Sequence, residues 1–323
     1  MKNVSILIPE TAVIEAIADP HYMFKAVNMF MQASGKRPLF NVVLVGMKKE
    51  VKLENSSYTV HADKLLKDVK KTDLVFIPAL SGDMKSALQL NKKLVPWIVD
   101  QYQKGAEVAS LCIGAFLLAS TGLLKGKKAS THWSRFNEFR EMFPDVELMN
   151  GSIITEEDRI YSSGGANSYW NLLLYLVEKY TDRDTAILAS KYFAIDIDRE
   201  SQAAFMMFEG QKDHDDAEIL KAQKFIESNY ADKITVDQLA EKYSIGRRSF
   251  ERRFKKATNN SVLEYIQRVK IEAAKRNFES SRKNINEVMF NVGYTDTKAF
   301  RTLFKKITGL TPIEYRNKYY KQN

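Results

Sequence analysis

RRSFERRFKK, at residues 247–256, and TKAFRTLFKK, at residues 297–306, are two versions of one sequence pattern. Each version holds two phenylalanines four positions apart, with basic residues between and after them. In the second version, the apolar residues from Phe300 to Ile307 follow the i, i+3, i+4, i+7 spacing that places side chains on one face of a helix. The sequence therefore predicts one helical unit that is used twice, with basic side chains on the outer face of each copy.

A short amphipathic segment and a turn precede each basic stretch. Residues 237–243 are followed by Gly246, and residues 286–292 are followed by Gly293. Glycine relieves backbone strain at a sharp helix reversal. Asp296 can cap the next helix by accepting a backbone N–H bond, whereas Gly246 makes a weaker cap. Helix, turn and basic helix form the helix-turn-helix pattern, so the sequence predicts two such motifs.

Residues 263–280, between the motifs, contain few helix breakers and are predicted to form a connecting helix. At about 1.5 Å per residue this helix is about 27 Å long. That length would hold the two basic helices near the spacing of successive major-groove faces, about 34 Å. One chain is therefore expected to read two adjacent grooves, and the C-terminal domain is expected to be all-α.

Positive charge is concentrated in the same part of the chain. Residues 217–323 carry 23 Lys and Arg against 12 Asp and Glu, a net charge of +11, whereas the whole chain of 323 residues carries +9. Lys and Arg that displace counterions from phosphates are typical of nucleic-acid binding. A uniformly basic solvated surface is the alternative, but it needs neither a duplicated apolar face nor two turns. We therefore expect double-stranded DNA as a partner.

The C-terminal residues also carry a family signature. The segments that make it up are Phe254-Lys255-Lys256, Gly293-Tyr294-x-Asp296, Phe304-Lys305-Lys306-x-x-Gly309-x-Thr311-Pro312 and Tyr315-Arg316. With them, residues 216–323 resemble the DNA-binding domain of the AraC family of transcriptional regulators. Two departures are Asn259-Asn260, where the first copy usually has glycine, and Val262, where proline is common. The resemblance implies a regulator that binds operator DNA and works with RNA polymerase.

The same resemblance implies which side chains meet DNA. Those expected to reach bases are Arg248, Glu251 and Arg252 in the first motif and Lys298, Arg301 and Thr302 in the second. Arg can bond guanine with two hydrogen bonds, and Glu can accept one from cytosine. The alternative for any of them is a phosphate contact, which positions the protein without reading sequence. We expect that role for Arg247, Arg253, Lys255, Lys256, Lys305 and Lys306.

The first two thirds of the chain show a different pattern. Short apolar runs at residues 4–8, 40–45, 74–77 and 108–111 alternate with helical stretches such as residues 91–104 and 113–120. This alternation predicts parallel strands joined by crossover helices, an α/β domain of flavodoxin-like type. A polar interruption at residues 210–216 suggests the boundary, which gives an N-terminal domain of residues 1–210 and a C-terminal domain of residues 216–323.

The only cysteine, Cys112, lies where the strand at residues 108–111 runs directly into a helix. The partial positive charge at a helix N-terminus lowers the pKa of a thiol and favours the thiolate, which predicts a nucleophile or redox sensor. The alternative is a small buried residue at a tight corner. For His132 the alternative to a catalytic role is a hydrogen-bonded residue at a helix start. The sequence leaves these alternatives open.

Three segments resemble the ThiJ/PfpI superfamily, which is related to class I glutamine amidotransferases. They are Cys112-Ile113-Gly114-Ala115, Gly122-Leu123-Leu124 and Ala129-Ser130-Thr131-His132-Trp133, joined by Ser163-Gly164-Gly165 before a further helix. The resemblance implies that residues 112–115 form a nucleophile elbow. Together with the AraC-like domain, the combination resembles the GlxA-type transcriptional regulators.

The superfamily resemblance supports two functions. In an active enzyme, Cys112 would be the nucleophile, His132 its base and Glu15 a modulator of thiol protonation, giving a cysteine hydrolase or deglycase tethered to DNA. In a regulator, the same three residues would line a pocket for an unknown small-molecule effector. Residues 78–82 replace the usual glycine-rich turn that binds an oxyanion, and Asn171 replaces a common aspartate. We therefore predict a regulator and no enzyme.

Other site classes lack support in the sequence. No segment supplies about 18 consecutive apolar residues, and one cysteine excludes an internal disulfide. The histidines at positions 21, 61, 132 and 214 lack the clustered spacing of a zinc site. We therefore expect a cytoplasmic protein without metal or cofactor. The family resemblance further implies a homodimer, although no segment marks its interface.

Overall fold

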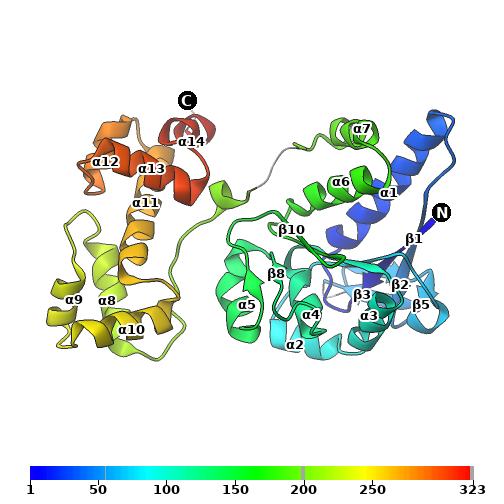
Figure 1. The fold of residues 1–323 in the computed structure, drawn as a ribbon, viewed down its shortest axis with the longest axis horizontal. Coiled ribbons are helices and arrows are strands. Elements are labelled where there is room, and N and C mark those ends of the chain that lie inside the picture. The colour runs from blue at the N-terminus through cyan, green and yellow to red at the C-terminus, as the bar shows by residue number, and fades with distance from the viewer. Residues whose placement is uncertain (55, 198–200, 321–323) are drawn as a thin grey trace. The chain divides into compact units, whose positions relative to one another are not determined.

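A computed structural model describes residues 1–54, 56–197 and 201–320. The chain divides into two compact units, an N-terminal unit of Met1–Gln202 and a C-terminal unit of Ala203–Asn323 (Figure 1). The segment 210–216, where the sequence suggests the boundary, thus lies inside the C-terminal unit. Its neighbours explain this placement, because residues 204–211 bond and pack against helices of that unit.

A seven-stranded sheet forms the centre of the N-terminal unit, with the order β10-β11-β7-β6-β1-β2-β5. All neighbouring strands are parallel except the β10–β11 pair, which is antiparallel. The strands are β1 (Lys2–Ile8), β2 (Phe40–Gly46), β5 (Lys64–Leu65), β6 (Leu74–Ile77), β7 (Glu107–Ser110), β10 (Ile154–Glu157) and β11 (Ile160–Ser163). The predicted mostly parallel α/β fold is confirmed.

Two small sheets flank the large one. They are formed by β3 (Glu50–Leu53) with β4 (Tyr58–His61), and by β8 (Lys128–Ala129) with β9 (Glu147–Leu148). Short 3-10 turns, η1 (Leu66–Asp68), η2 (Cys112–Gly114) and η3 (Trp133–Arg135), connect other elements.

Helices cover both faces of the sheet, which explains why every residue of the central strand β6 is apolar and buried. Along β6, Leu74 and Phe76 belong to one hydrophobic cluster, and Val75 and Ile77 belong to the other. This alternation is the period of two that a strand imposes on its side chains. The helices packed in the first cluster are α1 (Glu15–Ala33), α6 (Tyr169–Tyr180) and α7 (Arg183–Phe193). Those in the second are α2 (Met84–Leu90), α3 (Leu94–Gln103), α4 (Ala115–Ser120) and α5 (Phe136–Met142).

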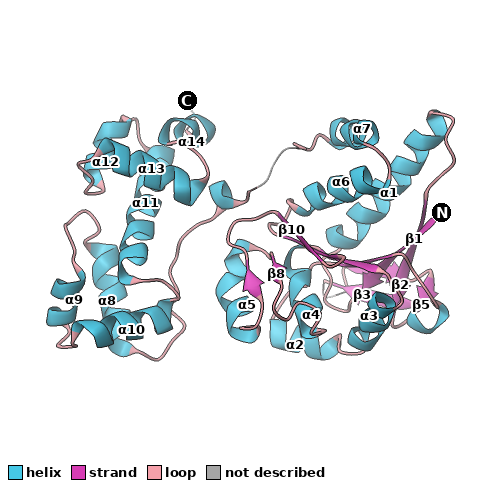
Figure 2. Ribbon diagram, viewed as in Figure 1, coloured by secondary structure: helices cyan, strands magenta, loops and turns pink. Residues whose placement is uncertain are grey.

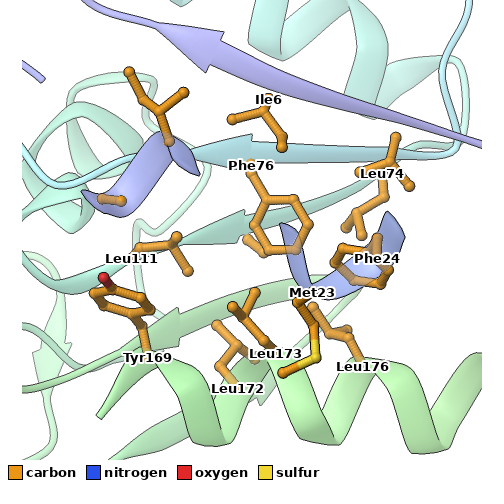
Figure 3. Close-up of a cluster of buried hydrophobic side chains, with 14 of the residues drawn as sticks. Ile6, Met23, Phe24, Leu74, Phe76, Leu111, Tyr169, Leu172, Leu173 and Leu176 are labelled. Atoms are coloured by element: carbon orange, nitrogen blue, oxygen red, sulfur yellow. The ribbon is translucent and has the colours of Figure 1, made fainter. Parts of the chain in front are cut away.

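Figure 3 shows the first of these clusters. Phe24 of α1 packs edge-on against Phe40, with ring centroids 4.7 Å apart, and lies 5.6 Å from Phe76. Leu172, Leu173 and Leu176 of α6 reach the same cluster and are fully buried. The packing fixes the start of α1 and the start of α6 beside the carboxyl ends of the strands. In open α/β sheets, ligands bind at that edge.

The C-terminal unit is helical (Figure 2). It opens with the turn η4 (Ala203–Phe205), and its helices are α8 (Ala217–Ser228), α9 (Val236–Lys242), α10 (Arg247–Thr258), α11 (Val262–Ser280), α12 (Ile285–Asn291), α13 (Thr297–Thr308) and α14 (Pro312–Tyr319). The predicted connecting helix is α11. Tyr265 and Ile266 of α11 belong to a cluster with α10, whereas Ala274 and Phe278 belong to a second cluster with α13.

Within residues 1–54, 56–197 and 201–320, no helix is long and apolar enough to cross a membrane.

Candidate nucleic-acid interface and elbow site

The two predicted motifs are α9–α10 and α12–α13, and their basic helices are built alike. The order of buried, half-buried and exposed residues along 251–260 recurs without change along 301–310. Phe250, Phe254 and Thr258 are buried in the first motif, as are their counterparts Phe300, Phe304 and Thr308 in the second. The apolar face predicted from the spacing therefore points into each cluster.

All the side chains expected to reach bases are exposed. They are Arg248, Glu251, Arg252, Lys298, Arg301 and Thr302. Of the residues expected to contact phosphate, Arg247, Lys255, Lys256, Lys305 and Lys306 are exposed, and Arg253 is half-buried. The fold thus presents both sets outward from α10 and α13, with one exception that its contacts explain.

Arg253 is engaged inside the protein. Its Nε and one terminal nitrogen donate to the two carboxylate oxygens of Asp216, at 2.8 and 2.6 Å. Asp216 is also the N-cap of α8, where it accepts from the backbone N–H of Ile219. The hydrogen bonds from Arg253 lower the pKa of Asp216. This two-bond contact ties α10 to α8 and competes with the phosphate contact that the sequence suggests.

Ion pairs on the exposed side of α10 are weaker. Arg247 lies 2.9 Å from Asp237 of α9 and 3.6 Å from Glu251 one turn along. The three side chains are 46–67% exposed, so salt screens these pairs and they contribute little stability. Phosphates can therefore replace the carboxylate partners of Arg247 at low cost.

The turns of the two motifs differ in a way that the sequence did not indicate. Gly293 has φ +73°, the left-handed conformation that glycine adopts readily, but Gly246 has φ −57°. In the first motif Ser244 holds the left-handed position, with φ +54°. The strain argument is therefore right for Gly293 and wrong for Gly246.

The observed caps of the two basic helices agree with the caps predicted from the sequence. Asp296 caps α13 by accepting from the backbone N–H groups of Lys298 and Ala299, at 2.8 and 3.0 Å. Gly246 caps α10 without a side-chain bond. At the other end of these helices, Asn259 takes the left-handed conformation that Gly309 takes in the second motif. Asn tolerates that conformation, which explains why the departure from glycine leaves the turn intact.

In the N-terminal unit, the strand β7 runs into an elbow formed by residues 111–115. Cys112 has φ +54°, an unusual conformation for a residue with a side chain. Gly114 packs so closely on the end of β6 that an added Cβ would lie 2.5 Å from the carbonyl oxygens of Ile77 and Pro78. The elbow is held by a bond from the Cys112 N–H to Ser163 Oγ and by one from Thr131 Oγ1 to the Cys112 carbonyl.

The Cys112 thiol is not activated by this setting. Its side chain is buried, at 4% exposure, and burial raises the pKa of the Cys112 thiol to about 12. The lowered pKa expected from a helix N-terminus is therefore wrong, because desolvation outweighs the partial charge of a short helical turn. At neutral pH the thiol is protonated, which agrees with the alternative of a small buried residue at a tight corner.

His132 lies after β8 and is the N-cap of η3. Its Nδ1 accepts from the Ser134 backbone N–H at 3.2 Å and lies 2.7 Å from Ser134 Oγ. Burial lowers the pKa of the imidazole, so it is neutral at pH 7. Among the described residues, no hydrogen bond joins the imidazole to Cys112. The contacts match the hydrogen-bonded residue at a helix start.

Glu15 begins α1 and is exposed, and it has a companion that sequence reasoning missed. Asp19, one turn along α1, accepts a 2.6 Å hydrogen bond from the hydroxyl of Tyr169 at the start of α6. Burial raises the pKa of the Asp19 carboxyl. Burial, and then the Asp19 hydrogen bond, raise the pKa of Tyr169. The contact between Asp19 and Tyr169 joins the starts of α1 and α6, and no sequence motif marks it.

Two further side-chain amides hold backbone segments of the N-terminal unit in place. Gln202, at 1% exposure, donates from Nε2 to the carbonyls of Thr131 and Ser152 at 3.1 and 3.2 Å. Asn171, in the place of the aspartate common in the superfamily, donates to the Asp196 carbonyl at 2.6 Å. Asn171 thus holds the chain after α7. Both roles depend on contacts between distant residues, so the sequence offered no signal for them.

Comparison with known proteins agrees with this division. Residues 24–179 match the DJ-1/PfpI family, and residues 239–318 match a helix-turn-helix domain. HTH-type transcriptional regulator ArgR of Pseudomonas aeruginosa is 26% identical over 216 residues, 67% of this chain and 65% of ArgR. The match thus spans less than two thirds of that relative. HTH-type transcriptional regulator CdhR of the same species is 22% identical over 265 residues, 82% of this chain and 78% of CdhR.

Among solved structures, an AraC family transcriptional regulator from Pseudomonas putida is similar with a TM-score of 0.51. The likeness covers 60% of this chain and 100% of that chain at 18% identity, and it concerns the fold alone. The family matches fall on the two units separately, one before and one after residue 202. The N-terminal unit therefore contains a DJ-1/PfpI domain, and the C-terminal unit contains a helix-turn-helix domain.

Proposed function

We propose that the chain is a sequence-specific DNA-binding transcriptional regulator whose N-terminal unit responds to a small molecule. One observation carries the proposal: the basic helices α10 and α13 repeat the same pattern of buried and exposed residues and present their polar side chains outward. The relatives ArgR and CdhR are named as transcriptional regulators. The narrower GlxA-type assignment stays a prediction.

The DNA partner would be read by the two motifs in adjacent grooves. Arg248, Glu251 and Arg252 would contact bases from the first motif, and Lys298, Arg301 and Thr302 from the second. The exposed Lys and Arg of both helices would hold phosphates, which accounts for the +11 charge of residues 217–323. A regulator of this kind would act on RNA polymerase at the promoter.

The effector would bind beside the elbow, at the carboxyl ends of β1, β7 and β11. Glu15, Cys112 and His132, predicted from the sequence, and Asp19 and Tyr169 would contribute to this site. Carboxylates and a tyrosine hydroxyl favour a ligand that donates hydrogen bonds or carries positive charge. Binding would shift the equilibrium between arrangements of the regulator on DNA.

The alternative, a cysteine hydrolase or deglycase, is less well supported. Such an enzyme needs a thiolate and a base within hydrogen-bonding reach of it. Burial raises the pKa of the Cys112 thiol, and among the described residues no hydrogen bond joins this thiol to His132. We therefore propose that the elbow serves binding and not catalysis.

Dimerisation is supported by an exposed apolar face on the N-terminal unit. Tyr22 and Met29 of α1 and Leu188 and Tyr192 of α7 are each 45–52% exposed. The two helices lie together, with the Tyr22 and Tyr192 hydroxyls 2.9 Å apart. At roughly 100 Å² each, four such side chains supply about half of the roughly 800 Å² that each partner buries in a standard interface. We infer that a second copy of the chain covers this face.

The test of the proposed function is binding of the purified full-length protein to its own upstream DNA and to a scrambled sequence across a salt series. We expect tighter binding to the upstream DNA at every salt concentration and a steep loss of affinity with salt on both. Equal affinity for the two sequences throughout the series would overturn the proposal.

A further inference from the structure

The first residues of the C-terminal unit follow directly after Gln202 and are held along their length by helices of that unit. The N-terminal unit ends at Gln202, and the C-terminal unit begins at Ala203. We name residues 203–210 the strap. We propose that the strap couples the elbow site to both helix-turn-helix motifs, so that a change beneath the elbow alters the DNA-binding unit. The inference rests on the proposed function for its purpose, but the coupling itself can be measured without DNA.

A buried ion pair of α11 clamps the middle of the strap. Lys275 and Glu272 lie 2.8 Å apart, with side chains only 5% and 11% exposed. Lys275 Nζ also donates to the Met206 carbonyl at 2.6 Å, and Glu272 Oε2 accepts from the Phe208 N–H at 3.2 Å. Each charge therefore has a strap partner as well as the other charge. Buried charges keep such partners because losing one is costly.

The strap contacts the hydrophobic clusters of both motifs. Its Phe208 ring packs edge-on against Tyr265 of the first cluster, with centroids 5.1 Å apart. Near its start, the Ala204 carbonyl accepts from the Tyr319 hydroxyl of α14 at 3.1 Å, and Lys318 lies over the Phe205 ring at 4.6 Å. Tyr319 packs against the second cluster. A displacement of the strap therefore acts on the two motifs at once.

The end of the strap is fixed by shape. Gly210 has φ +70°, and a Cβ added there would lie 2.2 Å from the Tyr265 hydroxyl oxygen. The following residue, Gln211, accepts a 2.7 Å bond at its carbonyl from Gln223 of α8. Glycine at position 210 thus lets the backbone pass directly over Tyr265. The strap has little freedom to slide along the C-terminal unit.

The residue before the strap is held beneath the elbow. Gln202 donates from Nε2 to the Thr131 carbonyl, and Thr131 Oγ1 donates to the Cys112 carbonyl. The backbone N–H of Gln202 donates to the Gly151 carbonyl at 2.8 Å. Within the described part of the chain, Gln202 Oε1 is buried and has no hydrogen-bond partner. A ligand at the elbow that offers an N–H or O–H to this oxygen would act directly on Gln202.

Gln202 and Ala203 are consecutive, so the two attachments are separated by no flexible linker. Gln202 is held by bonds within the N-terminal unit, and the strap is held by the buried ion pair within the C-terminal unit. Movement of Gln202 is therefore transferred to the strap and then to α11 and α14. A linker of several free residues would absorb the same movement.

The experiment is a cycle of two changes in the full-length protein, followed by amide hydrogen exchange. Gln202→Met keeps the buried volume and removes the Nε2 bonds. Glu272→Met with Lys275→Met removes both charges of the clamp together, which avoids leaving one charge buried and unpaired. The matched control is Glu218→Met with Lys221→Met, an exposed pair on α8 with the same 2.8 Å distance and i, i+3 spacing. Thr131→Val replaces Gln202→Met if that variant does not fold.

We expect Gln202→Met to raise exchange in the strap, in α14 and in α11 about threefold or more. With the clamp removed, the same change should have no further effect on α11, which the strap contacts at and beyond the clamp, whereas the exposed control pair should leave the effect intact. An equal effect of Gln202→Met with and without the clamp, or no effect in either background, would overturn the coupling. If the wild-type protein shows no sequence-selective DNA binding but the expected exchange pattern is found, the proposed function is overturned and the coupling stands.

Discussion

Replacing Arg253 by methionine distinguishes a structural role from a phosphate contact. The sequence places Arg253 among six side chains that hold phosphates, whereas in the structure both carboxylate oxygens of Asp216 accept hydrogen bonds from it. If the guanidinium stays on Asp216 when DNA binds, its removal should not change how affinity depends on salt. The change should instead loosen the contact between α8 and α10.

The magnitude follows from counterion release. Each phosphate contact contributes about −0.9 to the slope of log affinity against log salt, so six contacts give about −5.4 and five give about −4.5. We therefore expect a slope near −4.5 for the wild-type protein and the same slope for Arg253→Met. Lys256→Met, in the next turn of α10 and exposed, is the matched control and should reduce the slope by about 0.9.

The assay is fluorescence anisotropy with upstream DNA between about 50 and 200 mM salt, the range in which such slopes are well resolved. Thermal unfolding of the same variants separates a loosened fold from a lost DNA contact. A reduction of the slope by Arg253→Met equal to that of Lys256→Met would refute the reasoning. Arg253 would then leave Asp216 for a phosphate on the DNA.

Four further predictions concern the N-terminal unit, and in one of them Gly246 of the C-terminal unit is the comparison. Because burial raises the pKa of Cys112 to about 12, alkylation of the native protein at pH 8 should be about a thousandfold slower than after unfolding; rapid labelling would contradict the burial. The same shift should lower the free energy of unfolding as pH rises from about 9 towards 12, since the unfolded thiol ionises first, and Cys112→Ala should lack this slope in urea titrations. Gly114→Ala should cost about 2 kcal/mol or more, because its Cβ meets two backbone carbonyls at 2.5 Å. Gly246→Ala, with no atom within 4 Å, should cost under about 1 kcal/mol, and equal losses in urea would count against the argument. Tyr192→Glu should convert a dimer to a monomer in gel filtration, and an unchanged elution volume would place the interface elsewhere.

Local patterns account for most of what the sequence predicted. The strand β6 coincides with the apolar run at residues 74–77, and α11 begins one residue before the predicted connecting helix. The repeated phenylalanines predict the apolar faces of α10 and α13, because helical periodicity depends only on residues close together in the sequence. Asp296 was predicted as a cap for the same reason, since its partners are two and three residues away.

Contacts between distant segments account for what the sequence missed. Tyr169 meets Asp19 across 150 positions of the chain, and Gln202 reaches Thr131 across 71. The pKa of Cys112 was predicted with the wrong sign, because local position gives the helix N-terminus but not the degree of burial. The strain relief expected of Gly246 falls instead to Ser244, which lies two residues earlier in the same loop and takes the left-handed conformation.

The contribution of α11 to both hydrophobic clusters has a consequence for the operator. The two motifs are joined by a rigid element, so binding of one delivers the other to its groove as an intramolecular step at an effective concentration in the millimolar range. A weak second half-site then still adds to occupancy. An insertion of about five base pairs between half-sites would rotate the second groove to the opposite face of the duplex and remove that gain. For a protein with two linked motifs, the distance between half-sites therefore constrains an operator more tightly than the affinity of either half-site.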